Sequence, residues 1–508
     1  MKKILLLLLL FFGSKISYSQ TVPTFCASYG TSAFERNQCG VATFDGGYAA
    51  AGISFSSVYN QDNYIVKFDA SGNVLWSAVT GSDAVDDFFG ITETSDHHLI
   101  VVGLRDHHMI VMKYDEDGNM IWSKQIVIQT FDELSDVTET SDGNYLLTGD
   151  TRDDATGWSY CSVIKIDSDG NLLWNKNFYD FYRAETGYTC VETADKRYVV
   201  GLYSAAFSNA IMIISMDEDG VVQWTKKSDY SGVAYDMVAT SDSSVVIAGY
   251  ICLTSNCDPL LTKFDHDGNV EWSYTYGDSL FERFYSIVKL PDGSFAVGGD
   301  ATNQFDIYHG YTVKCNDEGQ LQWSNTDDEV EIRSIGTSPD GGLLVSSTNT
   351  SNVNDFGLKK MDINGVTCPQ CPVTSYGTQQ SGTSFTDISL SEFNLTAVIS
   401  DVVLNEPSST GFLSVHCSDV GIEENGKENF SLSIFPNPVS ENFQITIPQN
   451  FNAEKILITD VNGKIIYSKT ISSENKLVVD VSSFPRGIYS VQLIAEKKIA
   501  SAKFAVTR

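Results

Sequence analysis

The sequence predicts an all-β protein in which a seven-bladed β-propeller with four-stranded blades precedes a small immunoglobulin-like β-sandwich. Three observations predict this architecture: a repeat of about 50 residues, two turn signals in every repeat, and the absence of helical periodicity from the repeats. A short stretch near the N-terminus resembles part of the repeat and is expected to close the ring.

The first turn signal has the form Asp-x-x-Gly-x-x-x-Trp, as in Asp69–Trp76, and its glycine recurs every 46 to 52 residues. Short apolar, β-prone runs flank each copy, so the signal reads as a hairpin in which glycine takes a positive φ. The final copy, which begins at residue 362, is degenerate and lacks the tryptophan. The repeat glycines are Gly72, Gly118, Gly170, Gly220, Gly268, Gly319 and Gly365.

A second turn signal alternates with the first and is best seen in Thr140-Ser141-Asp142-Gly143-Asn144. It also separates two apolar runs, so each period contains two hairpins and therefore four strands, a to d. Four strands in about 50 residues are typical of a propeller blade, and seven copies predict seven blades. The other copies centre on Asp45, Asp96, Asp195, Asp242, Asp292 and Asp340.

The seventh repeat ends at Cys368, before its strand d. Residues 23–29 resemble strand d of an earlier repeat, with Phe25 at the position of Trp272. We therefore expect residues 23–29 to supply the outer strand of the last blade, which removes a free sheet edge.

The repeated tryptophan could pack between blades or present stacking platforms for sugar rings, and its constant position favours packing. Its motif resembles the tryptophan-docking motif of quinoprotein propellers but is one residue shorter. This resemblance implies the propeller fold and nothing further. The adjacent cysteine pair of many quinoprotein alcohol dehydrogenases is missing, so we expect no cofactor. Asp-x-Asp-Gly-Asn also resembles the first half of an EF-hand calcium loop, but the bidentate Glu at the twelfth position of such a loop is missing. We therefore predict no metal site, and weak Ca²⁺ binding at the surface stays an open alternative.

The first 19 residues have the form of a signal peptide read by the Sec translocon: Met1-Lys2-Lys3, an apolar run over 4–12 and Ser17-Tyr18-Ser19. We expect cleavage before Gln20 and no transmembrane segment in the mature protein. The net charge of −32 argues against nucleic acid and anionic membranes as partners.

In an oxidising compartment the ten cysteines are expected to pair. Cys252 and Cys257 would close one short loop, and Cys417 would pair with Cys368 or Cys371.

The loops between strands b and c and between strands d and a share one face, and their sequences vary most. We expect a glycan, peptide or protein ligand on this face. No catalytic motif is present and we assign no catalytic residue, although an exported hydrolase or lyase with acids in the central funnel is the alternative. His97-His98 and His107-His108 are expected on opposite faces, where they cannot share a metal. The candidate ligand-binding residues are Trp158, Tyr179, Tyr182, Asp306 and Tyr308.

The boundaries follow from these signals. The propeller spans 20–368, an extra β segment with two or three strands spans 369–418, and a polar linker spans 419–429. Residues 430–508 contain seven short β-prone runs separated by polar turns, which predict the sandwich.

Ordered motifs in this last domain, including 434–440, 460–464, 479–491 and 503–506, resemble the type A sorting domain of the type IX secretion system. The resemblance implies the type IX secretion machinery as a partner and export across the inner and outer membranes, to the cell surface or the medium. The sorting residues that it implies are Pro436, Asn437, Pro438, Gly463, Gly487, Tyr489 and Lys503.

Overall fold

The structure is a computed structural model. It describes residues 24–30, 34–57, 60–82, 84–179, 185–205, 209–253, 257–277, 281–302, 308–328, 330–349, 356–367, 374–375, 378–381, 383–387, 391–392, 398–401, 412–418, 430–431, 433–435, 439, 442–446, 455–460, 465–471, 476–495 and 498–506. The chain divides into two compact units, Met1–Val420 and Gly421–Arg508. The described residues are all-β, and they include no helix that could cross a membrane.

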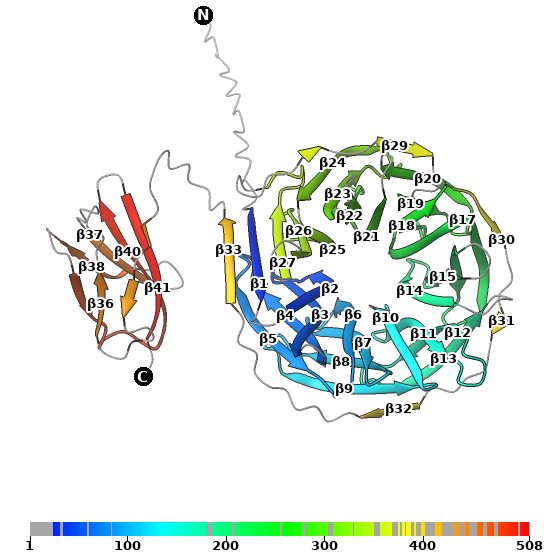
Figure 1. The fold of residues 1–508 in the computed structure, drawn as a ribbon, viewed down its shortest axis with the longest axis horizontal. Helices are drawn as coiled ribbons and strands as arrows, with labels where there is room; N and C mark the ends of the chain where they lie inside the picture. The colour runs from blue at the N-terminus through cyan, green and yellow to red at the C-terminus, as the bar shows by residue number, and fades with distance from the viewer. Residues whose placement is uncertain are drawn as a thin grey trace, which may run out of the picture. The chain divides into compact units, whose positions relative to one another are not determined.

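The first unit is a ring of antiparallel sheets around a central opening (Figure 1). Its strands form four-stranded groups, which we number I to VII in chain order and give from the innermost strand outward. Group I is β2 (Phe34–Ala42), β3 (Tyr48–Ser57), β4 (Asn60–Phe68) and β5 (Val74–Thr80). Group II is β6 (Asp86–Glu93), β7 (Leu99–Arg105), β8 (His108–Tyr114) and β9 (Met120–Val127). Group III is β10 (Phe131–Glu139), β11 (Tyr145–Arg152), β12 (Ser159–Ile166) and β13 (Leu172–Tyr179).

One long strand, β17 (Val222–Ala239), is the outer strand of group IV and continues as the inner strand of group V. Group IV is β14 (Glu185–Glu192), β15 (Tyr198–Ser204), β16 (Ala210–Met216) and the first half of β17. Group V is the second half of β17 with β18 (Val245–Cys252), β19 (Asp258–Phe264) and β20 (Val270–Gly277). Group VI is β21 (Glu282–Lys289), β22 (Phe295–Thr302), β23 (Tyr308–Cys315) and β24 (Leu321–Asp328).

Group VII is completed from the other end of the unit. It contains β25 (Val330–Thr337), β26 (Leu343–Asn349) and β27 (Phe356–Met361), and its outer strand is β1 (Phe25–Gly30). β1 pairs antiparallel with β27, so that Phe25 lies opposite Lys360 and Ala27 opposite Leu358. The predicted closing strand is therefore confirmed.

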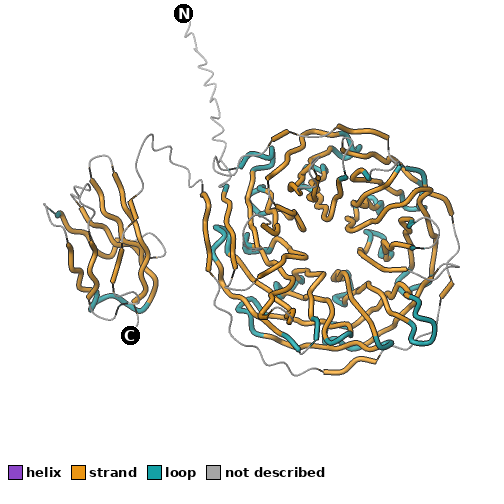
Figure 2. The backbone as a smooth tube through the Cα atoms, in the orientation of Figure 1, coloured by secondary structure: helices purple, strands orange, loops and turns teal. Residues whose placement is uncertain are grey.

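The segment after the ring forms a belt around it (Figure 2). Six short strands pair in turn with the outer strands of groups VI, V, IV, III and II and then with β1, in the direction opposite to the chain order of the groups. The sequence predicted only two or three strands here, because runs of two to four residues carry no readable periodicity. In the described part of the chain, β5 is the one outer strand without a belt strand. The belt strands are β28 (Thr374–Ser375), β29 (Thr378–Ser381), β30 (Phe385–Asp387), β31 (Ser391–Glu392), β32 (Val398–Asp401) and β33 (Phe412–Ser418).

The repeated tryptophans pack between neighbouring groups. The indole N–H of Trp76 donates to the carbonyl of Glu116 in the next group at 2.9 Å. Gly118 lies so close to this ring that an added Cβ would be 2.6 Å from Trp76, and its φ of 83° also requires glycine. Phe25 contacts Gly72 in the same way, in place of the missing tryptophan. The packing interpretation is therefore confirmed.

The second unit has two sheets on one hydrophobic core, which includes Phe443, Ile458 and Val491. Each of the seven β-prone runs in the sequence corresponds to a strand. One sheet contains β34 (Phe430–Ser431), β41 (Lys498–Val506), β40 (Gly487–Ala495), β37 (Lys455–Asp460) and β38 (Ile465–Thr470). The other contains β35 (Ser433–Phe435), β36 (Asn442–Thr446) and β39 (Lys476–Asp480).

Candidate functional site: the central channel

The innermost strand of every group has a register irregularity at the same place. In group V, for example, Ala234 and Asp236 pair with adjacent residues of β18, so Tyr235 is left as the extra residue of a β-bulge. A bulge redirects a side chain, and here the redirected side chains line the centre of the ring. The bulged residues, from group I to group VII, are Gln38, Phe89, Ser135, Tyr188, Tyr235, Tyr285 and Arg333.

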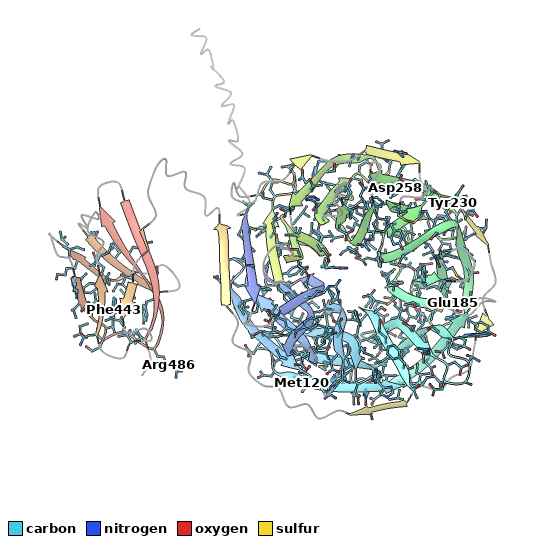
Figure 3. The ribbon with its side chains drawn as sticks, in the orientation of Figure 1. Met120, Glu185, Tyr230, Asp258, Phe443 and Arg486 are labelled. Atoms are coloured by element: carbon cyan, nitrogen blue, oxygen red, sulfur yellow. A yellow bond between two sulfur atoms is a disulfide. The ribbon has the colours of Figure 1, made fainter. Side chains whose placement is uncertain are left out.

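All of these side chains line one cavity of about 320 Å³, together with their neighbours on the inner strands. This volume lies at the lower end of the range typical of small-molecule sites. Figure 3 helps to locate the layers, because Glu185 lies on an inner strand of the ring and Met120 on an outer strand.

Three tyrosines from consecutive groups form an aromatic wall on one side of the channel. Tyr188 meets Tyr235 edge to face at a centroid distance of 5.4 Å, and Tyr235 lies 4.9 Å from Tyr285. The guanidinium of Arg333 sits 4.4 Å from the centroid of Tyr285, and that of Arg283 sits 5.1 Å from it. These cation–π contacts fix one end of the wall beside a positive charge.

Two of the channel carboxylates connect neighbouring groups. Asp136 accepts the backbone N–H of Cys190 in the next group at 2.9 Å, and Asp236 accepts that of Ile287 at 2.8 Å. Burial and the nearby Asp236 together raise the pKa of Asp136 to about 7, and burial raises the pKa of Asp236 to about 6. Because their oxygens accept backbone N–H groups, these acids hold the ring together.

Asp86 and Asp132, on the inner strands, also have a structural role. Asp132 accepts the backbone N–H groups of Ile128 and Gln129, at 2.8 and 3.0 Å, in the loop that enters its strand. Asp86 accepts the N–H of Asp106 at 2.9 Å. Both carboxylates therefore order loops on the face opposite the repeated turns.

Glu133 differs from these acids. It lines the cavity, and none of the described residues donates a hydrogen bond to it. Burial raises its pKa to about 7. A carboxyl group with this pKa in a channel can bind a cation or exchange a proton near neutral pH.

Two of the candidate residues predicted on the variable loops, Trp158 and Tyr179, are described and lie outside this cavity lining. Trp158 is exposed in the loop before β12. Tyr179, in the same group, ends β13, and its ring meets that of Tyr160 edge to face at a centroid distance of 5.4 Å. Tyr308 begins β23. Tyr182 and Asp306 lie outside the described residues, so the predicted cluster of five stays a prediction.

The sorting residues are only partly described. Tyr489 is buried in the second unit, and its hydroxyl donates to the carbonyl of Pro485 at 2.7 Å. Gly487 begins β40, where it pairs with Val506, and Lys503 pairs with Ser490. Pro436, Asn437, Pro438 and Gly463 lie outside the described residues.

The cysteine predictions have different outcomes. The expectation that all ten cysteines pair is wrong for Cys39, Cys161, Cys190 and Cys315, which are free thiols on four different strands. The Cys252–Cys257 disulfide is confirmed. Cys26 is disulfide-bonded and lies opposite Cys417 in the β1–β33 pairing. Cys368 and Cys371 fall outside the described residues, so their predicted pairing with Cys417 stays a prediction.

The predicted separation of the two histidine pairs agrees with their surroundings. His97 contacts Phe44 in a repeated turn, whereas His108 faces Asp132 at the other end of the strands.

Sequence reasoning missed the channel residues, although a signal for them exists. Each bulged residue lies seven positions before the aspartate of the second turn signal, as Tyr235 lies before Asp242. Their residue types differ from copy to copy, so they stand out only after the bulge is known.

Comparison with known families identifies the C-terminal domain. Residues 433–507 match the family described as the secretion system C-terminal sorting domain. This chain carries a type IX sorting domain. The sorting domain directs export to the cell surface or the medium and implies contact with the type IX secretion machinery.

The ring has its own match. Residues 27–274 match the family described as outer membrane protein assembly factor BamB, which agrees with the propeller-like repeats. No curated protein matches the sequence.

Similar solved structures include Sqt1 from Chaetomium thermophilum, with 11% identity, 70% of this chain and 90% of that chain covered, and a TM-score of 0.42. A protein of unknown function from Dyadobacter fermentans DSM 18053 has 10% identity, coverage of 68% and 99%, and a TM-score of 0.41. YCF48 bound to D1 peptide has 11% identity, coverage of 68% and 96%, and a TM-score of 0.38. At these TM-scores, none of the three bears on the function of this chain.

Proposed function

We propose that this chain is an exported binding protein whose seven groups are the blades of a β-propeller and whose channel receives a glycan or peptide ligand. The observation that carries the proposal is the cavity of about 320 Å³ lined by the bulged residue of every group. Aromatic faces with a few polar groups are what a cavity needs to hold and orient a small ligand or the end of a chain.

The variable loops would extend this site. Trp158, Tyr179, Tyr182, Asp306 and Tyr308 remain our candidates for contacts outside the channel, and the exposed indole of Trp158 supports such a role. In the mature protein, which we expect to start at Gln20 after Sec-dependent export, the immunoglobulin-like sandwich over 430–508 would serve sorting alone.

A plugged channel tests the proposal. The mature full-length chain is applied to glycan and peptide arrays beside Ser135→Trp, which places an indole in the channel, and Ser71→Trp, which places one on an exposed turn. We expect hits that Ser135→Trp loses and Ser71→Trp keeps. Hits retained by both variants would contradict the channel as the site.

The alternative function is a hydrolase or lyase. Glu133 favours it, because a carboxyl group with a pKa of about 7 suits general acid–base catalysis. Turnover of a polysaccharide or peptide by the mature chain, abolished by Glu133→Gln, would replace the binding proposal with this one. Binding without turnover would exclude it for the substrates tested.

A further inference from the structure

Two carboxyl groups face each other across the inner strands of group III. Glu133 on β10 and Asp150 on β11 are directly paired, so their side chains leave the same face of the sheet. Neither has a hydrogen-bond donor or a salt-bridge partner in the described part of the chain. Like charges directly opposite one another destabilise a sheet, so this pair needs either protons or a cation.

A third buried carboxyl group lies on the inner strands of the neighbouring group. Asp87 in group II is 7% exposed, and its Oδ2 accepts the amide of Gln38 at 3.1 Å while its Oδ1 is buried without a partner. Burial and the charge of Glu133 outweigh the lowering by the Gln38 hydrogen bond and by Arg36, so the pKa of Asp87 rises to about 8. Burial, followed by Glu133 and Asp132, likewise raises the pKa of Asp150.

The aromatic wall interacts with these carboxyl groups. Burial and the nearby Tyr235 raise the pKa of Tyr188, and the charges of Asp150 and Glu133 raise it further. Tyr188 and Glu133 also line the same cavity. Carboxylates next to a tyrosine ring offer a cation both hydrogen-bond acceptors and a negative aromatic face.

We propose that the channel binds an organic cation, a primary ammonium or guanidinium group, between the Glu133–Asp150 pair and the ring of Tyr188. The inference rests on the proposed binding function and specifies its ligand chemistry. A metal ion fits less well, because the described residues contain no group of three or more side chains arranged to hold one. An anion would add a like charge to the pair.

Binding would release protons. The charged groups that interact electrostatically with the pair are Asp87 on β6 and Asp132 on β10, and Arg36 on β2 interacts in turn with Asp87. Asp132 leaves the opposite face of the sheet, where backbone N–H groups hold it and its Oδ2 lies 3.5 Å from Nδ1 of His108. Of these, only Arg36 offers a permanent positive charge. The carboxyls must ionise to accept the ligand, so the affinity should rise from pH 5 to pH 8.

The experiment uses matched probes whose charge is removed by acetylation. A blocked Gly-Lys-Gly peptide and the disaccharide of glucosamine are titrated calorimetrically into the mature full-length chain at pH 8, beside their N-acetylated forms. We expect at least one amine to bind about tenfold or more tightly than its acetylated form. Proton release is expected for the lysine peptide, whose amine is already charged at pH 8, because the carboxyls then supply the proton that leaves. The peptide and the sugar then distinguish the two possible sources of the ammonium group.

Substitutions locate the site. Glu133→Gln and Asp150→Asn should each weaken binding of that amine about tenfold, because each removes one charged acceptor. Glu218→Gln, on an exposed turn, should leave binding unchanged. Gln and Asn preserve side-chain shape and remove a buried charge, and thermal unfolding of each variant checks that it remains folded.

Three results would overturn the inference: no binding of either amine, equal binding of the acetylated forms, or full binding by both Glu133→Gln and Asp150→Asn. These results can be distinguished from a failure of the proposed binding function. A neutral array ligand that is lost in Ser135→Trp would uphold the binding function and contradict the cation.

Discussion

The repeated turns and the inner strands of the ring follow opposite rules. At the turns, nearly every group uses the same residues for the same contacts: Lys67 binds Asp45 at 2.8 Å, and Lys360 binds Asp340 in group VII. On the inner strands the backbone bulge is constant, but the bulged residue changes from Gln38 to Tyr235 to Arg333. The turns therefore build the ring, and the bulged residues distinguish one group from the next.

The lysine contacts also explain how the turns couple neighbouring groups. Lys113 donates to Asp96 in its own group and to the hydroxyl of Tyr145 in the next, both at 3.0 Å. Lys165 repeats this arrangement with Asp142 and Tyr198. Changes on the turn side should therefore affect stability, and changes on the channel side should affect binding.

The largest effect is expected from removing a packing tryptophan. Trp272 packs against the next group and donates to the carbonyl of Asp317 at 3.2 Å, so Trp272→Ala should cost about 3–5 kcal/mol of unfolding free energy. Trp158→Ala, at an exposed loop, should cost less than about 0.5 kcal/mol. Chemical denaturation of both variants measures the difference, and equal losses would contradict the packing role.

Breaking a lysine contact should have an intermediate effect. Lys113→Met should cost about 1–2 kcal/mol, because it removes hydrogen bonds to Asp96 and Tyr145 while the half-exposed Asp96 stays hydrated. Burial alone would raise the pKa of Asp96, but hydrogen bonds from Thr94 and Lys113 outweigh it and lower the pKa to about 2.

The pH dependence follows from this lowered pKa. The stabilisation by ionised Asp96 is complete above its unfolded pKa, near 4, and is lost as the pH falls towards 2. Thermal unfolding from pH 6 to pH 2 should show the penalty of Lys113→Met shrinking with acid. A penalty that is constant across this range would contradict the ion pair.

Glu133→Gln should stabilise the protein, whereas the two substitutions above destabilise it. Burial raises the pKa of Glu133 to about 7, so ionising it destabilises the fold progressively as the pH rises from its unfolded value, near 4, through 7. The variant should be more stable than the wild type at pH 8, by about 1–3 kcal/mol, and equal to it below pH 4. Equal stability at pH 8 would show that Glu133 already has a partner.

Much of the fold could be predicted because its determinants are local and repeated. Asp69 and Gly72 predict a hairpin from their turn preferences alone. Phe25 could be aligned with a tryptophan position because the other repeats show where that residue falls. The sorting domain carries ordered motifs, which made it recognisable.

The candidate site was less predictable for physical reasons. A bulge at Tyr235 arises from how two strands pair, and no turn residue marks it. Glu133 and Asp150 become neighbours through strand register, across a turn that separates them in the chain. The belt strands contain too few residues to show alternation, and the Lys113–Asp96 contact joins two motifs that look independent in the sequence.

Two tyrosines of β17 distinguish ligand binding in the channel from binding elsewhere on the ring. Tyr235 lines the cavity, whereas Tyr230, on the same strand, is exposed at the outside of the ring (Figure 3). Affinity for the tightest array ligand is measured by calorimetry for Tyr235→Ala and Tyr230→Ala. We expect a loss of about tenfold or more for Tyr235→Ala and no change for Tyr230→Ala. Equal affinities, or a loss confined to Tyr230→Ala, would contradict binding in the channel.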